Sequence, residues 1–223
     1  MAAPTPSYVQ LVNDSGNTGK KARTQSRQVG ADVVHEHFFV PVSRRSKKGT
    51  FYYSPALQSV QAAAQNGTAS GFFWLQNPIG SAVSMVLREL AVRFNNNAAT
   101  AAASSPRLVL VKFTFTGTAS GASVTPAKRK ASDDNPLGFL RTDPAGMSIS
   151  LGATIASLLV PVVMTAAGDF ASGQQVWPAS KDPLEDDGLE LAPGEGLVLY
   201  QPDAGTATDP RRFVANLTVE EAE

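Results

Sequence analysis

Cysteine is absent from this sequence of 223 residues, and histidine occurs only as His35 and His37. The missing thiols exclude a disulfide framework and thiolate metal sites, although they do not identify the compartment. In a strand, positions i and i+2 face the same side, so both imidazoles could reach one metal ion. No cysteine can supply a third ligand, and a polar strand face explains the pair more simply. We therefore expect no bound metal and no cofactor.

Long apolar runs are also missing. The longest one, Ile155 to Met164, has about ten residues and contains Pro161, whereas a membrane-spanning helix needs about 20. The opening residues, Met1 to Leu11, lack the charged and apolar regions of a secretory signal. We expect a protein that does not enter a membrane and that is made in a cytoplasm.

The sequence has no excess of positive or negative charge, because its 19 lysines and arginines balance its 19 acidic residues. The chain as a whole is therefore not a polyelectrolyte binder. The charges are unevenly placed, since residues 1–50 carry a net +5 and residues 181–223 a net −8. A basic head and an acidic tail suit head-to-tail contacts between copies in a homo-oligomer, and two solvated surfaces that never meet are an equal alternative.

Catalytic motifs are scarce as well. No G-x-S-x-G turn occurs that would expose a nucleophilic serine beside a histidine base. The segment Asp14 to Lys21 resembles a phosphate-binding loop only superficially, because that motif needs glycine at Asp14 and serine or threonine at Lys21. We expect a protein that is not an enzyme.

An acidic cluster lies around Gly188. Calcium loops place acidic residues at alternate positions, but Pro183 and Leu184 interrupt such spacing here. A solvated loop is therefore favoured over a weak cation site. The cluster consists of Asp182, Glu185, Asp186, Asp187 and Glu190.

Basic side chains gather in residues 20–27 and 44–48, and a polar excursion over 126–146 contains a third basic run, 128–130. The first two runs could contact nucleic-acid phosphates, but no recognition helix or stacking motif accompanies them. An acidic face of a neighbouring subunit explains them equally well. We do not expect direct nucleic-acid binding, and we assign four residues to an interaction arm: Lys20, Lys21, Arg23 and Arg27.

What the sequence has in plenty is β-forming composition and turns. Its 18 glycines and 15 prolines punctuate short segments rich in valine, threonine and aromatic residues. Residues 57–65 fit a strand or a short helix, and residues 83–94 fit both spacings, of which we favour the strand. Further strands are predicted over 33–42, 51–54, 72–75, 108–115, 147–151, 157–164, 196–201 and 212–219.

Turn signals connect these segments. Asn66-Gly67 predicts a turn, around which we expect residues 57–65 and 72–75 to form a hairpin. The sequence Gly67 to Gly71 recurs as Gly117 to Gly121, which indicates two similar turns whose glycines permit positive φ. Nine or ten strands at this spacing predict an all-β fold, an antiparallel two-sheet β-sandwich of jelly-roll-like or Greek-key topology.

Residues 1–30 differ from the rest. They contain the turn-rich segments 4–7 and 13–19, and residues 20–28 hold almost no apolar side chain. Such a stretch cannot bury enough surface to offset its ordering entropy alone. We expect an extended N-terminal arm over 1–30, ordered where it lies on a neighbour, and a β-sandwich domain over 31–223. A merely disordered terminus is an equal alternative.

Several phrases resemble structural proteins of tailed bacteriophages. The stretch Tyr8 to Gln25, followed by Val34 to His37, resembles their opening. The resemblance runs over nearly the whole chain and consists of turn and strand phrases, not catalytic signatures. It implies a virion component with a β-sandwich body, of the decoration or auxiliary type, and it brings no functional residues with it. The other phrases are 65–68, 77–81, 113–118, 194–198 and 211–213.

On this basis we expect a bacteriophage virion structural protein, located in the particle. The favoured role is a capsid decoration or cement protein that binds the major capsid protein or other virion proteins, and also neighbouring subunits. A tail, collar or baseplate component is the alternative within the virion. A carbohydrate- or receptor-binding module is an alternative from another class, although core packing is favoured for most of its candidate stacking residues. These are Phe51, Tyr52, Tyr53, Trp74 and Trp177.

Overall fold

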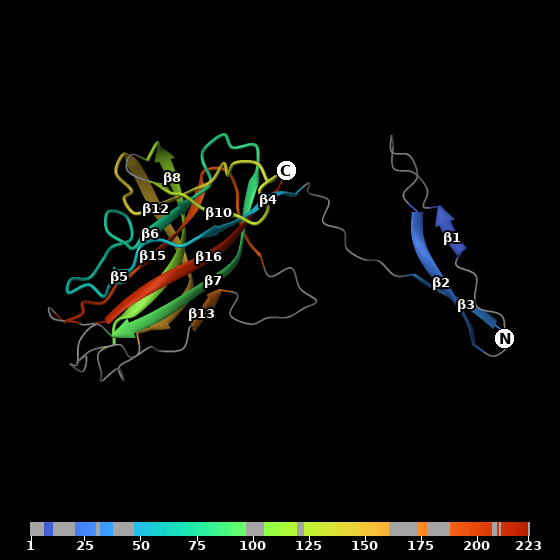
Figure 1. Ribbon diagram of the computed structural model, residues 1–223, viewed down its shortest axis with the longest axis horizontal. Helices are drawn as coiled ribbons and strands as arrows, with labels where there is room; N and C mark the ends of the chain where they lie inside the picture. Colours follow the sequence, from blue (N-terminus) through green and yellow to red (C-terminus); the bar gives the residue numbers. More distant parts are fainter. Residues whose placement is uncertain are drawn as a thin grey trace. The chain divides into compact units, whose positions relative to one another are not determined.

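Figure 1 shows the computed structural model of the chain. The chain divides into two compact units, Met1–Arg44 and Arg45–Glu223. Every regular element described in either unit is a β-strand, as the composition predicts. The structure describes residues 7–10, 21–29, 32–37, 47–96, 105–119, 123–160, 174–177, 188–206, 209 and 211–222. For 7–10, 21–29 and 32–37, and for positions 47, 96 and 175, it describes the backbone alone.

The first unit contains a three-stranded antiparallel sheet in the order β1 (Ser7–Gln10), β2 (Lys21–Val29) and β3 (Asp32–His37). The sequence assigned most of β3 to the sandwich, within a strand over 33–42, but β3 pairs with β2. Only two residues separate these strands, and so short a connection joins antiparallel neighbours in one sheet. The boundary between the compact units falls after Arg44, whereas the sequence placed it after residue 30.

The second unit is a sandwich of two antiparallel sheets (Figure 1), so the predicted fold class is confirmed. The seven-stranded sheet has the order β10 (Ala127–Lys128), β4 (Lys47–Tyr53), β16 (Arg211–Ala222), β7 (Ser84–Asn96) and β13 (Gln174–Trp177), with β5 (Gln58–Ser59) on β16 and β14 (Leu189–Leu191) on β7. The six-stranded sheet has the order β12 (Met147–Leu159), β8 (Arg107–Gly117), β15 (Glu195–Tyr200), β6 (Phe73–Gln76), β11 (Phe139–Arg141) and β9 (Ser123–Val124).

The main core lies between the two sheets. Most of the ambiguous segment 83–94 belongs to β7, so the preference for a strand is confirmed. Buried residues alternate with more exposed ones along β16, and its buried face contributes Phe213 and Leu217 to the core. The Phe213 ring meets Phe72 edge-on, with ring centroids 4.7 Å apart, and lies 5.7 Å from Phe94. Fully burying one such side chain contributes about 1.5–3 kcal/mol.

A second apolar cluster lies on the opposite face of the six-stranded sheet. The segment 61–72 covers part of it, because the Trp74 indole donates a hydrogen bond to the Gly67 carbonyl at 3.0 Å. Strands buried on both faces read as continuous apolar runs, which explains why Phe73–Gln76 shows no alternation. The cluster consists of Trp74, Val109, Val111, Phe113, Phe115 and Val198.

The predicted turn at Asn66-Gly67 is present, but the predicted hairpin around it is wrong. The Asn66 side-chain oxygen accepts hydrogen bonds from three following N–H groups at 2.9–3.1 Å. Gly67 and Gly117 have φ values of 75° and 86°, as the repeated sequence predicts. However, β5 pairs with β16 and β6 with β15, so the intervening segment passes between sheets. Gln201 fixes that passage through two hydrogen bonds to the Gln61 backbone, at 3.0 and 2.7 Å.

Candidate functional site

The residues predicted for the interaction arm belong to the first unit. Lys21, Arg23 and Arg27 lie in β2, which pairs with β1 on one side and with β3 on the other. Lys20 lies outside the described residues. The backbone of the three described arm residues is therefore paired within a sheet.

The other polar candidates are only partly described. His35 and His37 lie in β3, where the description stops at the backbone. Of the acidic cluster, Glu190 lies in β14, whereas residues 182–187 lie outside the described part, as do residues 14–20. Among the side chains that are described, no three carboxylates or imidazoles come together in a way that would hold a metal ion.

The five candidate stacking aromatics do not form one platform. Phe51, Tyr53 and Trp74 are buried, which agrees with the core role that the sequence favoured for most of them. Tyr52 is 43 % exposed on β4, and Trp177 is half-buried on β13. Two separated aromatics do not provide the continuous surface on which a sugar ring would stack.

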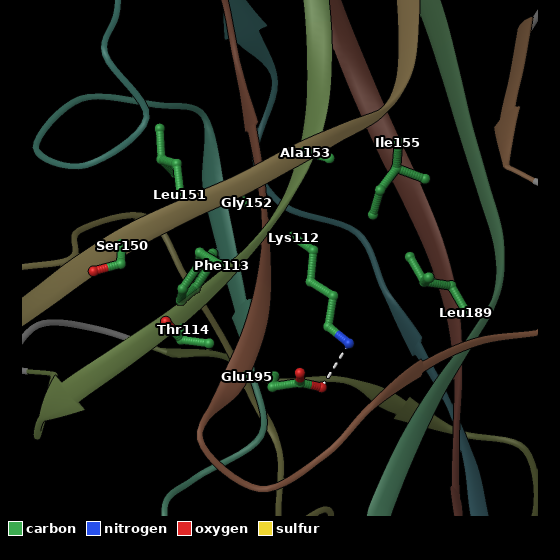
Figure 2. Close-up of a pocket in the computed structure, with 10 residues that line it drawn as sticks. All are labelled: Lys112, Phe113, Thr114, Ser150, Leu151, Gly152, Ala153, Ile155, Leu189 and Glu195. Atoms are coloured by element: carbon green, nitrogen blue, oxygen red, sulfur yellow. Dashed lines mark ion pairs between the residues drawn. The ribbon is translucent and has the colours of Figure 1, made fainter.

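One hollow lies where residues of β8, β12, β14 and β15 come together (Figure 2), and we call it the aliphatic groove. Its volume is about 410 Å³. The pairing of β12 with β8 shifts register on both sides of Thr154, and Gly152 lets the backbones approach, since a Cβ there would lie 3.0 Å from the Lys112 carbonyl oxygen. The lining residues are Lys112, Phe113, Thr114, Ser150, Leu151, Gly152, Ala153, Ile155, Leu189 and Glu195.

The charged groups of the aliphatic groove neutralise each other. Figure 2 shows Lys112 and Glu195 pointing toward each other, and their Nζ and Oε2 atoms are 2.7 Å apart. The ammonium also donates to the Glu190 carbonyl at 3.3 Å, while the Glu195 carboxylate accepts from the Ala192 N–H at 2.7 Å. The ten lining residues include no histidine, so the hydroxyls of the groove have no such base beside them. The groove therefore offers a mainly apolar contact surface.

A smaller hollow in the sandwich is basic, and we call it the basic hollow. Its volume is about 220 Å³, and its lining residues supply three cations and one carboxylate. The local charge is therefore positive although the chain as a whole has no net charge. The lining residues are Lys48, Gly49, Thr50, Arg129, Lys130 and Asp133.

Pairing of β10 with β4 brings two basic segments together at this hollow. Just beyond β10, the Arg129 N–H donates to the Thr50 carbonyl at 2.9 Å. Asp133 closes the following turn, since its N–H donates to the Lys130 carbonyl at 3.0 Å and its side chain accepts from the Lys130 N–H at 3.2 Å. The Lys128 ammonium donates to the Asp133 carbonyl at 2.9 Å. These bonds hold Arg129 and Lys130 on a fixed turn beside β4.

Thr50 adds an unsatisfied polar group to the basic hollow. The residue is 5 % exposed, and its hydroxyl has no hydrogen-bond partner among the described residues. Leaving such a group unpaired costs about 1–3 kcal/mol, so native proteins usually satisfy it with water, an ion or a ligand. Lys48 and the run 128–130 were visible in the sequence as basic residues, but their proximity depends on the pairing of β10 with β4, two strands far apart along the chain.

No family model, no curated protein and no solved structure matches this chain. In the described part of the chain, no helix is long and apolar enough to cross a membrane. Function is therefore inferred from the residues and from the fold.

Proposed function

We propose that this chain is a structural subunit of a bacteriophage particle, and within the particle a decoration or cement protein bound to the head shell. The phage assignment draws on the resemblance carried by phrases such as Tyr8 to Gln25 and Phe113 to Thr118. The structural role draws on the fold, in which a small three-stranded sheet with a basic central strand precedes a β-sandwich along the chain.

The division into two compact units is the observation that supports this role most strongly. The sandwich has an apolar core built from its own strands. The central strand of the first unit, Lys21–Val29, has the sequence KARTQSRQV and offers little apolar surface. A small three-stranded sheet with so polar a central strand gains little stability from burial by itself. Contact with a neighbouring subunit or a shell protein would supply the missing burial.

A repetitive shell suits a subunit of this kind. Many copies that each make modest contacts are held firmly through multivalency, without one tight binding site. The net +5 of residues 1–50 and the net −8 of residues 181–223 complement each other between copies. The proposed partners are therefore the major capsid protein, other virion proteins and further copies of this chain.

The direct test is binding of the full chain to expanded capsids that lack it, compared with a variant without residues 1–44. The cut belongs after Arg44, because a cut after residue 30 would leave β3 without its partner β2. We expect the deletion to weaken capsid binding at least about tenfold and to leave the thermal melting of the sandwich unchanged. Equal binding by both proteins would overturn the proposed role of the arm.

A charge variant separates electrostatic contact from loss of the whole unit. We expect glutamine at Lys21, Arg23 and Arg27 to weaken capsid binding most at low ionic strength, since salt screens exposed charges. Arg93→Gln, at an exposed position of β7, is the matched control and should bind as the unaltered chain does.

Counting the copies of this protein in intact particles decides its location. Hundreds of copies indicate the head shell, and a few to a few dozen indicate the tail or connector.

A further inference from the structure

We propose that the basic hollow binds a phosphate-type oxyanion. The hollow is formed entirely by residues of the sandwich, and this inference does not depend on the phage assignment. Its supporting observations are the convergence of cations from two strand regions, the buried hydroxyl of Thr50 and the small volume of the hollow.

The charges around the basic hollow suit an anion. Its lining residues include three cations, Lys48, Arg129 and Lys130, and one carboxylate, Asp133. Phosphate groups are negatively charged at pH 7 both as monoesters and as diesters, so a lining of net positive charge attracts either. Guanidinium and ammonium groups are the side chains that most often bind phosphate oxygens, the first through paired donors and the second as a point charge.

The Thr50 hydroxyl gives the hollow a hydrogen-bonding group that has no partner among the described residues. It belongs to a buried residue in the wall of a positively charged hollow, and no described protein group bonds to it. A phosphate oxygen would accept a hydrogen bond from this hydroxyl and remove the cost of the unsatisfied group. A hydrogen bond from Thr50 to bound phosphate also explains why this position of β4 has a polar side chain instead of an apolar one.

The size of the hollow favours a small ion. Pockets that enclose drug-sized ligands have volumes of about 300–1,000 Å³, whereas this hollow measures about 220 Å³. The turn that carries Arg129 and Lys130 is held by backbone hydrogen bonds, so the cations need little reorganisation to meet the ion. The ligand class is therefore a single phosphate group, either free or part of a nucleic-acid backbone.

Titration of the full chain with inorganic phosphate at pH 8 and low salt tests the proposal by calorimetry. We expect saturable binding, a melting temperature that rises with phosphate concentration, and at least about a tenfold loss of affinity in Arg129→Gln and in Lys130→Gln. Arg93→Gln, an exposed cation outside the hollow, should retain the original affinity. Absence of saturable binding, or equal losses in all three variants, would overturn the proposal.

Two further variants test the polar members of the basic hollow. Thr50→Val should melt no lower than the original chain in phosphate-free buffer, because the hydroxyl has no protein partner, yet it should bind phosphate more weakly. Asp133→Asn removes a like charge, keeps an oxygen that can accept from the Lys130 N–H, and should bind phosphate several-fold more tightly. Unaltered phosphate binding in both variants would contradict an ion held at this place.

A competition experiment distinguishes the two sources of phosphate. If the site takes a free ion, a short DNA duplex should not displace bound phosphate at equal phosphate-group concentration. If it takes a nucleic-acid backbone, the duplex should compete, and its affinity should fall with salt and with Arg129→Gln. Either result supports an oxyanion site and assigns its source.

Discussion

Two places in the sandwich connect its sheets through charged side chains, and they differ in burial. Glu221 of β16 is 1 % exposed, and its carboxylate accepts hydrogen bonds at 2.8–3.0 Å from the N–H groups of Leu137 and Gly138, which precede β11 of the other sheet. The Lys112 side chain of β8 is 34 % exposed, and it reaches the Glu190 carbonyl of β14 in the opposite sheet.

Solvent access decides what each connection contributes. A buried N–H that loses its partner costs about 1–3 kcal/mol, whereas an exposed ammonium that loses its partner bonds to water. The Glu221 connection is also tightly packed, because a Cβ at Gly138 would lie 2.2 Å from the Met85 sulfur. The Glu221 connection therefore holds the sheets together. The Lys112 connection borders the aliphatic groove, where side chains can be replaced without loss of the fold.

The largest effect is expected from Glu221→Ala. The substitution leaves the buried Gly138 N–H and the partly buried Leu137 N–H without an acceptor, so the free energy of unfolding should fall by about 3 kcal/mol in equilibrium denaturation with urea. Glu195→Ala in the aliphatic groove is the matched control, since it removes a carboxylate that is 25 % exposed, and it should cost less than about 1 kcal/mol. Equal losses in the two variants would abolish the contrast between the two connections.

Tyr53 gives the Glu221 connection a pH dependence. Burial of the phenol, followed by the nearby Glu221 charge, raises the pKa of Tyr53 well above its ordinary value. The folded chain therefore keeps this proton at a pH where the unfolded chain releases it. The contribution to stability is complete below about pH 10, and above it falls by about 1.4 kcal/mol per pH unit.

Comparison with Tyr53→Phe isolates this contribution. The variant loses the hydrogen bond from the phenol to the Gly138 carbonyl, 3.2 Å long, and should be less stable by about 1 kcal/mol at pH 7. Between about pH 10 and pH 11 the difference should shrink and then reverse, because the variant has no buried phenol to ionise. Parallel stability curves for the two proteins over that range would show that Tyr53 is not the titrating group.

The sequence predicted the sandwich better than it predicted the connections within it. Alternation and apolar runs identify the strands around Phe94, Phe113 and Phe213, because the order of apolar and polar residues within each strand reflects which of its faces are buried. The passage fixed by Gln61 and Gln201 was predicted as a hairpin, since nothing local shows that the chain changes sheets there. The basic hollow was missed for the same reason. The sequence shows each basic segment, but it does not show that β10 pairs with β4 and brings the two segments together.

The smallest effect is expected from Lys112→Met in the aliphatic groove. Methionine keeps much of the length of the side chain beside Ile155 and Leu189, while the ion pair with Glu195 is lost. A partly exposed pair contributes about 0–1 kcal/mol, so the free energy of unfolding should change by less than about 1 kcal/mol. The difference from the original chain should shrink further as salt is raised, because salt screens the pair. A loss as large as that of Glu221→Ala would mean that the groove is a structural connection and not a surface free to meet a partner.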